Sequence, residues 1–234
     1  SSVEDLRALG LDVGDFVVPL AHPLITDSGF VRSRHLDDKA GVAATLAALK
    51  ALKEADVELP VHAQLLVTCT EEIGHGASHG LDPDVAEMVS VDAAIVAPGQ
   101  QSRETAVTVA MADSVGPFDY HLTRRMHALA RENDIEVVRD TFAHYRSDAA
   151  AAIEAGAHLR VALLGFGVDA SHGHERTHMN SLHGLARLLT VWLQSDLVFP
   201  RWDANAEGPL RSFPSLAVQP AQEEGPQEGP IEVE

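Results

Sequence analysis

Two adjacent aspartates stand immediately before a run of residues that predicts a helix. They are Asp37 and Asp38 in HLDDKAG, and the helical pattern follows as GVAATLAALKALKEA. One acidic residue at a helix start is ordinary, because its carboxylate accepts hydrogen bonds from free backbone N–H groups and favours the positive end of the helix dipole. A second carboxylate at the same place suggests a further role, such as binding a cation.

Two adjacent glutamates, Glu71 and Glu72, follow the predicted strand VHAQLLVTCT at its carboxyl end. Ligands of open α/β sheets bind at this end of the strands. Neighbouring carboxylates repel each other unless a cation or a proton separates them. With a metal ion present, one glutamate could coordinate it while the other holds the attacking water as a general base. Taken alone, such a pair more often lies on a solvated loop. Gly74 and Gly76, which follow the pair, would let the backbone approach the site closely.

Asp92 interrupts the otherwise apolar strand MVSVDAAIVAPG. A buried aspartate needs a partner, which is either a set of hydrogen bonds in the core or a metal ion. Both interpretations remain open for this residue.

Histidines gather after the last predicted strand, in SHGHERTH between Ser171 and His178. Histidine is the commonest metal ligand, although each of these residues by itself is more often a surface residue. One imidazole would complete a site of oxygen and nitrogen ligands. That mixture is expected for zinc, cobalt or manganese rather than for calcium.

Helices and strands that alternate along the chain must position these groups. A short helix in 1–10 and two or three short strands around the turn Asp27-Ser28-Gly29 come first. The hydrophobic pattern then predicts helices over 37–55, 117–133, from Ser147 and over 177–194, and strands over 61–70, 88–95, 105–110, near Val137 and over 159–164. The order predicts an α/β fold with three α/β/α layers and a mixed, largely parallel sheet.

Composition narrows the function classes. The 234 residues are 45% hydrophobic, which suits one large domain, and 17 basic against 35 acidic residues give a net charge of -18. This charge excludes attraction to nucleic acid or an anionic membrane surface, so we expect a small substrate or a cation as partner. No apolar run is long enough to span a bilayer, and Cys69 as the only cysteine allows no internal disulfide, so we expect a cytoplasmic protein. Residues 201–234 are acidic and rich in Pro and Gly, which predicts a disordered tail.

Five segments together resemble the dinuclear metallo-aminopeptidases of the tetrahedral (TET), glutamyl aminopeptidase type, in the clan of the zinc exopeptidases. They are LDDKAGVA, TCTEEIGHGAS, SVDAAIVAPG, YRSDAAAAIEAG and GVDASHGHERTH, in family order, and they cover most of 36–189. The residues of these segments are more similar still to a bacterial subgroup associated with the gene cluster of the osmoprotectant N-acetylglutaminylglutamine amide.

This resemblance implies a zinc-exopeptidase-like fold and two divalent metal ions, zinc or cobalt, with manganese as an alternative. It makes Asp37 the carboxylate that bridges the ions, Glu72 a ligand of one ion, Asp92 a ligand of the other and Glu71 the general base. In this clan the peptide bond after the bridging aspartate is commonly cis.

For the remaining positions, the resemblance implies His172 as the histidine ligand, with His174 as the alternative and His178 at the start of the last helix. Asp38 and Asp148 would support the ligands without binding the metal directly.

The family also uses an N-terminal histidine that the sequence does not contain in the matching context. We therefore expect 1–33 to be the return segment from a missing or truncated small β-domain, and 34–200 to be the C-terminal part of the catalytic domain. The expected activity is hydrolysis of peptide or amide bonds, as an aminopeptidase, with an inactive fragment as the alternative for this chain alone because the N-terminal histidine ligand is absent. Alternatives are an amidase or deacylase of small blocked dipeptides and a non-catalytic metal-binding or assembly subunit. We expect a peptide-like substrate and a homo-oligomer in the intact protein.

Overall fold

A computed structural model describes residues 2–199 of the chain. Its helices and strands, in chain order, are α1 (Val3–Ala8), β1 (Leu24–Ile25), β2 (Phe30–Ser33), α2 (Leu36–Glu54), the 3-10 turns η1 (Glu71–Ile73) and η2 (Gly76–Ser78), β3 (Glu87–Ile95), β4 (Val107–Ala112), α3 (Tyr120–Glu132), β5 (Val137–Thr141), α4 (Asp148–Glu154), β6 (Arg160–Val168), β7 (Glu175–His178) and α5 (Met179–Leu193). The predicted tail over 201–234 lies outside the described residues.

The central sheet has four strands in the order β3-β6-β4-β5. β3 pairs in parallel with β6, and β4 pairs in parallel with β5, whereas β4 and β6 run antiparallel. The predicted α/β fold with a mixed, largely parallel sheet is thus confirmed. The sheet brings Asp92 of β3 next to β6, whose chain continues into the predicted histidine loop.

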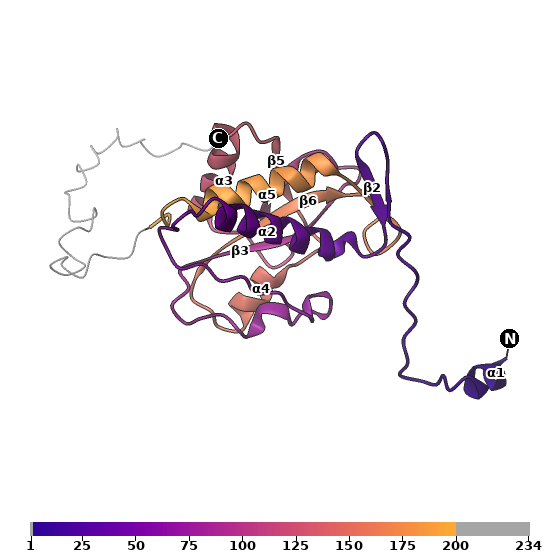
Figure 1. Cartoon of the computed structure of the whole chain (residues 1–234). Helices are drawn as coiled ribbons and strands as arrows, with labels where there is room; N and C mark the ends of the chain where they lie inside the picture. The colour runs from indigo at the N-terminus through magenta and orange to yellow at the C-terminus, as the bar shows by residue number, and fades with distance from the viewer. Residues whose placement is uncertain (1, 200–234) are drawn as a thin grey trace, which may run out of the picture. The chain divides into compact units, whose positions relative to one another are not determined.

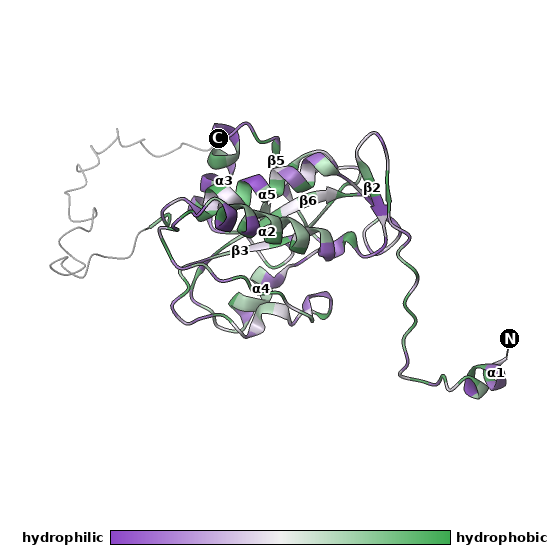
Figure 2. Ribbon diagram, viewed as in Figure 1, coloured by the Kyte–Doolittle hydropathy of each residue, from purple (hydrophilic) through white to green (hydrophobic). Residues whose placement is uncertain are grey.

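Helices cover both faces of this sheet, with α2 and α5 on one side and α4 on the other (Figure 1). Alternate residues of β6 show the division, because Leu164 and Phe166 belong to the core under α2 and α5, while Leu163 packs in a second core with Ala149 of α4. In Figure 2, α5 carries both hydrophobic and hydrophilic residues along its length. This pattern fits a helix that buries one face against a sheet.

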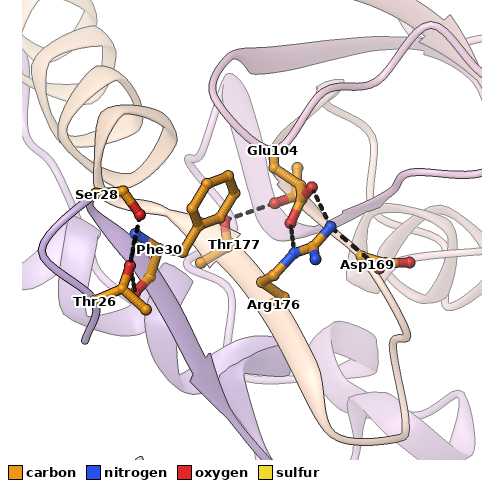
Figure 3. Close-up of polar contacts among 8 residues, drawn as sticks. Thr26, Ser28, Phe30, Glu104, Asp169, Arg176 and Thr177 are labelled. Carbon is orange, nitrogen blue, oxygen red and sulfur yellow. Dashed lines mark hydrogen bonds and ion pairs between the residues drawn. The ribbon is translucent and has the colours of Figure 1, made fainter. Parts of the chain in front are cut away.

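A second, smaller sheet has the order β1-β2-β7, with antiparallel pairs. Arg176 of β7 anchors it to the loop before β4. The guanidinium donates hydrogen bonds to Glu104 from Nε (2.6 Å) and from Nη2 (2.9 Å), and it forms an ion pair with Asp169 (Figure 3). This bidentate contact ties β7 to the loop before β4.

Two predictions of secondary structure are wrong. Residues 61–70 form no strand, and Leu65, Val67 and Cys69 are exposed rather than buried. An alternating apolar pattern favours an extended backbone, but a strand also needs a neighbour for its N–H and C=O groups, and among residues 2–199 no strand pairs with this segment. The helix predicted over 177–194 begins later, because 175–178 pair with β2 as strand β7.

At the start of the chain, α1 forms as predicted and buries none of its residues. Within residues 2–199, every helix is too short or too polar to cross a bilayer.

Candidate metal centre

Asp37 lies at the turn that leads from β2 into α2. The peptide bond between Asp37 and Asp38 is cis, as the resemblance implied, and both residues have non-helical backbone angles within α2. Ser171 Oγ donates a hydrogen bond of 2.8 Å to Asp37 Oδ2. The carboxylate of Asp37, only 10% exposed, therefore has a fixed orientation.

Asp37, Glu72 and His172 form a first group of possible metal ligands. One ligand atom from each lies within 4.8 Å of the others. His172 Nε2 is 3.0 Å from Glu72 Oε2 and 3.6 Å from Asp37 Oδ2. These residues come from three distant parts of the chain, so the fold brings together the side chains that the sequence suggested.

Asp37, Asp38 and Asp92 form a second group, which shares Asp37 with the first. Burial raises the pKa of Asp38 well above its ordinary value, and the negative charges of Asp92 and Asp37 raise it further. The pKa of Asp92 is likewise raised, by burial first and then by Asp37 and Glu71. Asp38 Oδ1 is buried and has no hydrogen-bond partner among residues 2–199.

Glu71 lies beside both groups and lines the same cavity of about 540 Å³ as Asp37, Glu72, Asp92 and His172. Burial raises its pKa from 4.5 to about 7, and the negative charges of Asp148, Glu72 and Asp37 contribute. A carboxyl group with a pKa near neutral pH can both take and return a proton.

Asp148, at the start of α4, holds the loop that carries the two glutamates. Its Oδ2 accepts a hydrogen bond from Thr68 Oγ1 (2.7 Å), and its Oδ1 accepts one from the backbone N–H of Ala77 (2.9 Å). A Cβ at Gly76 would lie 1.9 Å from Asp148 Oδ1, so this contact requires glycine there, as the predicted close approach of the backbone implied. Asp148 belongs to neither group of possible ligands among the described residues.

The other two histidines of the predicted loop lie elsewhere. His174 is exposed and belongs to neither group within residues 2–199. His178 ends β7, where its Nε2 lies 2.8 Å from the carbonyl oxygen of Ser28 and its ring packs edge-on against Phe30. Of the three candidates, only His172 approaches the carboxylates of the first group.

Sequence reasoning missed Ser171 and Glu175. Glu175 is 1% exposed, and its carboxylate accepts hydrogen bonds from the backbone N–H groups of Leu36, Asp37 and His172. A signal was present, since Glu175 follows the histidines within HGHERTH. Its spacing alone could not separate a buried acceptor from another surface charge.

The residues present fit divalent metal ions. Four carboxyl groups, those of Asp38, Glu71, Glu72 and Asp92, have raised pKa values because burial and mutual repulsion disfavour their charges. A bound cation would favour the charged form of these carboxyl groups. Asp38 Oδ1, which has no hydrogen-bond partner among residues 2–199, offers the cation a further oxygen. Carboxylate oxygens with one imidazole nitrogen are a donor set suited to zinc and related ions.

Known proteins resemble this chain in sequence and in fold. "Putative aminopeptidase YhfE" of Bacillus subtilis (strain 168) is 40% identical over 195 residues, which are 83% of this chain and 56% of that relative. The TET aminopeptidase of the marine sediment archaeon Thaumarchaeota archaeon SCGC AB-539-E09 has a similar fold, with a TM-score of 0.70 at 17% identity over 82% of this chain and 57% of that one.

Aminopeptidase APDkam598 of Desulfurococcus kamchatkensis matches with a TM-score of 0.69 at 20% identity, over 85% of this chain and 58% of that one. The chain thus spans little more than half the length of these proteins. The family model of the M42 glutamyl aminopeptidases matches residues 1–188. The chain belongs to the M42 glutamyl aminopeptidase family.

Proposed function

We propose that the protein is a metal-dependent aminopeptidase. The observation that carries the proposal is the convergence of Asp37, Glu72 and His172 within 4.8 Å, beside the second group that Asp37 forms with Asp38 and Asp92. Membership of the M42 family supports the same activity.

In this proposal Asp37, Glu72 and His172 would hold one divalent ion, and Asp37 and Asp92 would hold a second. The ions would be zinc or cobalt, with manganese as an alternative. When bound, such ions polarise a scissile carbonyl and make water more acidic. Ser171 would hold Asp37 in place through its hydrogen bond, and Asp38 would support the ligands from its position beside Asp37 and Asp92.

Glu71 acts as the general base. It takes a proton from the attacking water and delivers it to the leaving amine, because it lines the same cavity as the proposed ligands. Asp148 supports Glu71 by holding the loop through Thr68 and Ala77.

The substrate in this proposal is a small peptide with a free amino terminus. The cavity is lined by acidic residues, which suit an ammonium group, and by Phe142 and Leu163, which suit an apolar part of the substrate. We further propose that the intact protein forms a homo-oligomer and is cytoplasmic. The Pyrococcus horikoshii TET1 peptidase, whose fold is similar (TM-score 0.67, 20% identity, 82% of this chain and 58% of that one), can assemble into a tetrahedron or a large octahedral shell.

The test compares hydrolysis of a free-amine dipeptide with that of its N-acetylated form by the chain loaded with Zn²⁺ or Co²⁺. We expect only the free-amine substrate to be cleaved. Glu71→Gln should lower the rate by about 10²- to 10⁴-fold while the metal content stays unchanged. Glu132→Gln, which changes an exposed glutamate at the end of α3, is the matched control and should retain full activity.

Other outcomes would replace the proposal. Preferential cleavage of the N-acetylated substrate would favour an amidase or deacylase. A chain that binds metal but hydrolyses neither substrate would favour a non-catalytic metal-binding subunit. This holds if hydrolysis stays absent after the part of the family pattern that this chain does not span is added. Full activity of the Glu71→Gln variant would remove Glu71 as the base.

A further inference from the structure

Glu175 is a buried carboxylate that the proposed mechanism does not use. It is the first residue of β7 and is 1% exposed. It belongs to neither group of possible metal ligands among residues 2–199, because both of its oxygens face backbone N–H groups. A buried carboxylate is costly unless it accepts hydrogen bonds of this kind, so its position calls for an explanation.

The hydrogen bonds of Glu175 join two segments that are far apart in the sequence. Oε2 accepts from the N–H groups of Leu36 (2.5 Å) and Asp37 (3.1 Å), at the turn into α2. Oε1 accepts from the N–H of His172 (3.1 Å), in the loop after β6. One side chain therefore joins the backbones of Asp37 and His172, beside the hydrogen bond of Ser171 to the Asp37 side chain.

The backbone at His172 needs such support. Its φ of 62° and that of Ala170, 58°, lie in the left-handed region, which is strained for a residue with a side chain. Arg34 Nη1 donates to the carbonyl oxygen of Gly173 (3.3 Å), and Ser171 Oγ donates to Asp37 Oδ2 (2.8 Å). The bond from His172 N–H to Glu175 acts on the residue with the left-handed backbone itself, and its acceptor is a buried side chain.

Arg176, the next residue, holds β7 from the opposite side. Its guanidinium is joined to Glu104 and Asp169 (Figure 3). Successive side chains of a strand point to opposite faces, so Arg176 positions β7 on the molecule while Glu175 projects toward the candidate metal centre. Arg176 thus anchors β7 as a whole, whereas Glu175 supports the backbones of the proposed ligands.

We propose that Glu175 is a positioning residue that sets the metal affinity of the group Asp37, Glu72 and His172 by clamping the backbones of Asp37 and His172. This inference rests on the proposed metal centre. Substituting residues that orient metal ligands from behind typically lowers metal affinity by about 10- to 100-fold.

The test is the dissociation constant of Zn²⁺, measured by competition with a chelator, together with the visible absorption of the Co²⁺-loaded chain. Glu175→Gln keeps the shape but places an amide N–H against a backbone N–H, so we expect Zn²⁺ binding about 10- to 100-fold weaker and an altered Co²⁺ spectrum. The matched control is Glu104→Gln, which weakens the anchor of β7 through Arg176. It should lower stability to urea while leaving Zn²⁺ affinity and the Co²⁺ spectrum unchanged.

Several results would overturn the inference. Wild-type Zn²⁺ affinity in Glu175→Gln would refute it, and an equal loss in Glu104→Gln would assign the effect to the docking of β7 in general. If Glu175→Gln does not fold, Glu175→Asp keeps the charge but shortens the side chain, and unchanged affinity in that variant would refute the clamp. A wild-type chain that binds no Zn²⁺ would instead contradict the proposed function.

Discussion

The two sides of the candidate metal centre are held in different ways. Asp37 and His172 lie on backbones that Glu175 joins, and Asp92 lies in β3, which pairs along its whole length with β6. Glu71 and Glu72 instead follow 61–70, a segment that pairs with no strand among residues 2–199. Asp92 is thus part of the sheet, and the backbones of Asp37 and His172 are joined by Glu175, whereas the loop with the two glutamates is held by hydrogen bonds to the side chain of Asp148.

This difference indicates where the centre is preorganised. A ligand on a paired strand keeps its geometry without metal, because the ladder and the core beneath it resist movement. A ligand on a loop keeps its geometry only as well as its local hydrogen bonds allow. Substitutions in the two regions should therefore differ in size, and the following predictions run from the largest effect to the smallest.

The largest effect is expected in the sheet. Leu164 of β6 is fully buried, and Leu164→Ala should lower the free energy of unfolding by about 2–5 kcal/mol, because the cavity left behind cannot collapse fully. Urea unfolding of the metal-free chain measures this value. A loss below about 1 kcal/mol would mean that the sheet is not the rigid side of the centre.

A smaller effect is expected at Asp148. Asp148→Ala removes the acceptors of Thr68 Oγ1 and Ala77 N–H, and should cost about 1–3 kcal/mol of stability. Asp148→Asn is the control, because its amide oxygen can still accept from Ala77 while its NH₂ group donates to the Thr68 hydroxyl. Equal stability of the alanine variant and the wild type would show that Asp148 does not hold the loop.

Removing the charge of Asp148 should also change the ionisation of Glu71. Among the neighbouring charges, that of Asp148 raises the pKa of Glu71 most. Asp148→Asn should therefore lower this pKa below about 7 in the metal-free chain. An NMR titration of the Glu71 carboxyl carbon reports it. An unchanged pKa would mean that the two carboxylates are farther apart than the structure places them.

The stability of the metal-free chain should fall as the pH rises from about 4.5 to about 7. In this window the folded state binds more protons than the unfolded state, because folding raises the pKa of Glu71 from 4.5 to about 7. The part of the slope that Glu71 contributes should stay below about 1.4 kcal/mol per pH unit, the value for one fully shielded proton, since Glu71 is partly exposed to water. Asp38, Glu72 and Asp92, whose pKa values are also raised, contribute in the same direction. Urea unfolding with a chelator at several pH values measures the slope, and Glu71→Gln should reduce it. Stability that rises across this window would contradict the raised pKa.

The smallest effect is expected in the unpaired segment. Leu65 is 40% exposed, so Leu65→Ala should cost no more than about 1 kcal/mol, although it removes the same atoms as Leu164→Ala. If both substitutions cost the same in urea unfolding, then 61–70 is packed like a sheet strand and the contrast between the two regions is wrong.

The sequence predicts the fold class and much of the site for physical reasons that particular residues illustrate. The alternation in β6 and the helical pattern of α5 depend on burial against one sheet, which local sequence records. Asp37 and Glu72 stand out because carboxylates at a helix start and after a predicted strand fall where a sheet brings chain ends together, and the resemblance to the metallo-aminopeptidases implies His172 among the histidines.

Other features depend on distant partners and leave little trace in the local sequence. The pattern of 61–70 favours a strand, yet it does not say whether a neighbouring strand is available to pair with it. Glu175 is an acidic residue in a polar stretch, and only its contacts with Leu36, 139 positions away, distinguish it from a surface charge. Contacts between segments that are far apart in the sequence are recognised only in the folded structure.

The central claim is that Asp37, Glu72 and His172 hold one divalent cation between them. A crystal structure of the chain soaked with Zn²⁺, with anomalous diffraction recorded at the zinc edge, tests this claim most directly. We expect an anomalous peak about 2.0–2.2 Å from a carboxylate oxygen of Asp37, a carboxylate oxygen of Glu72 and Nε2 of His172. A saturated crystal with its zinc peaks on other side chains, and none between these three, would contradict the account.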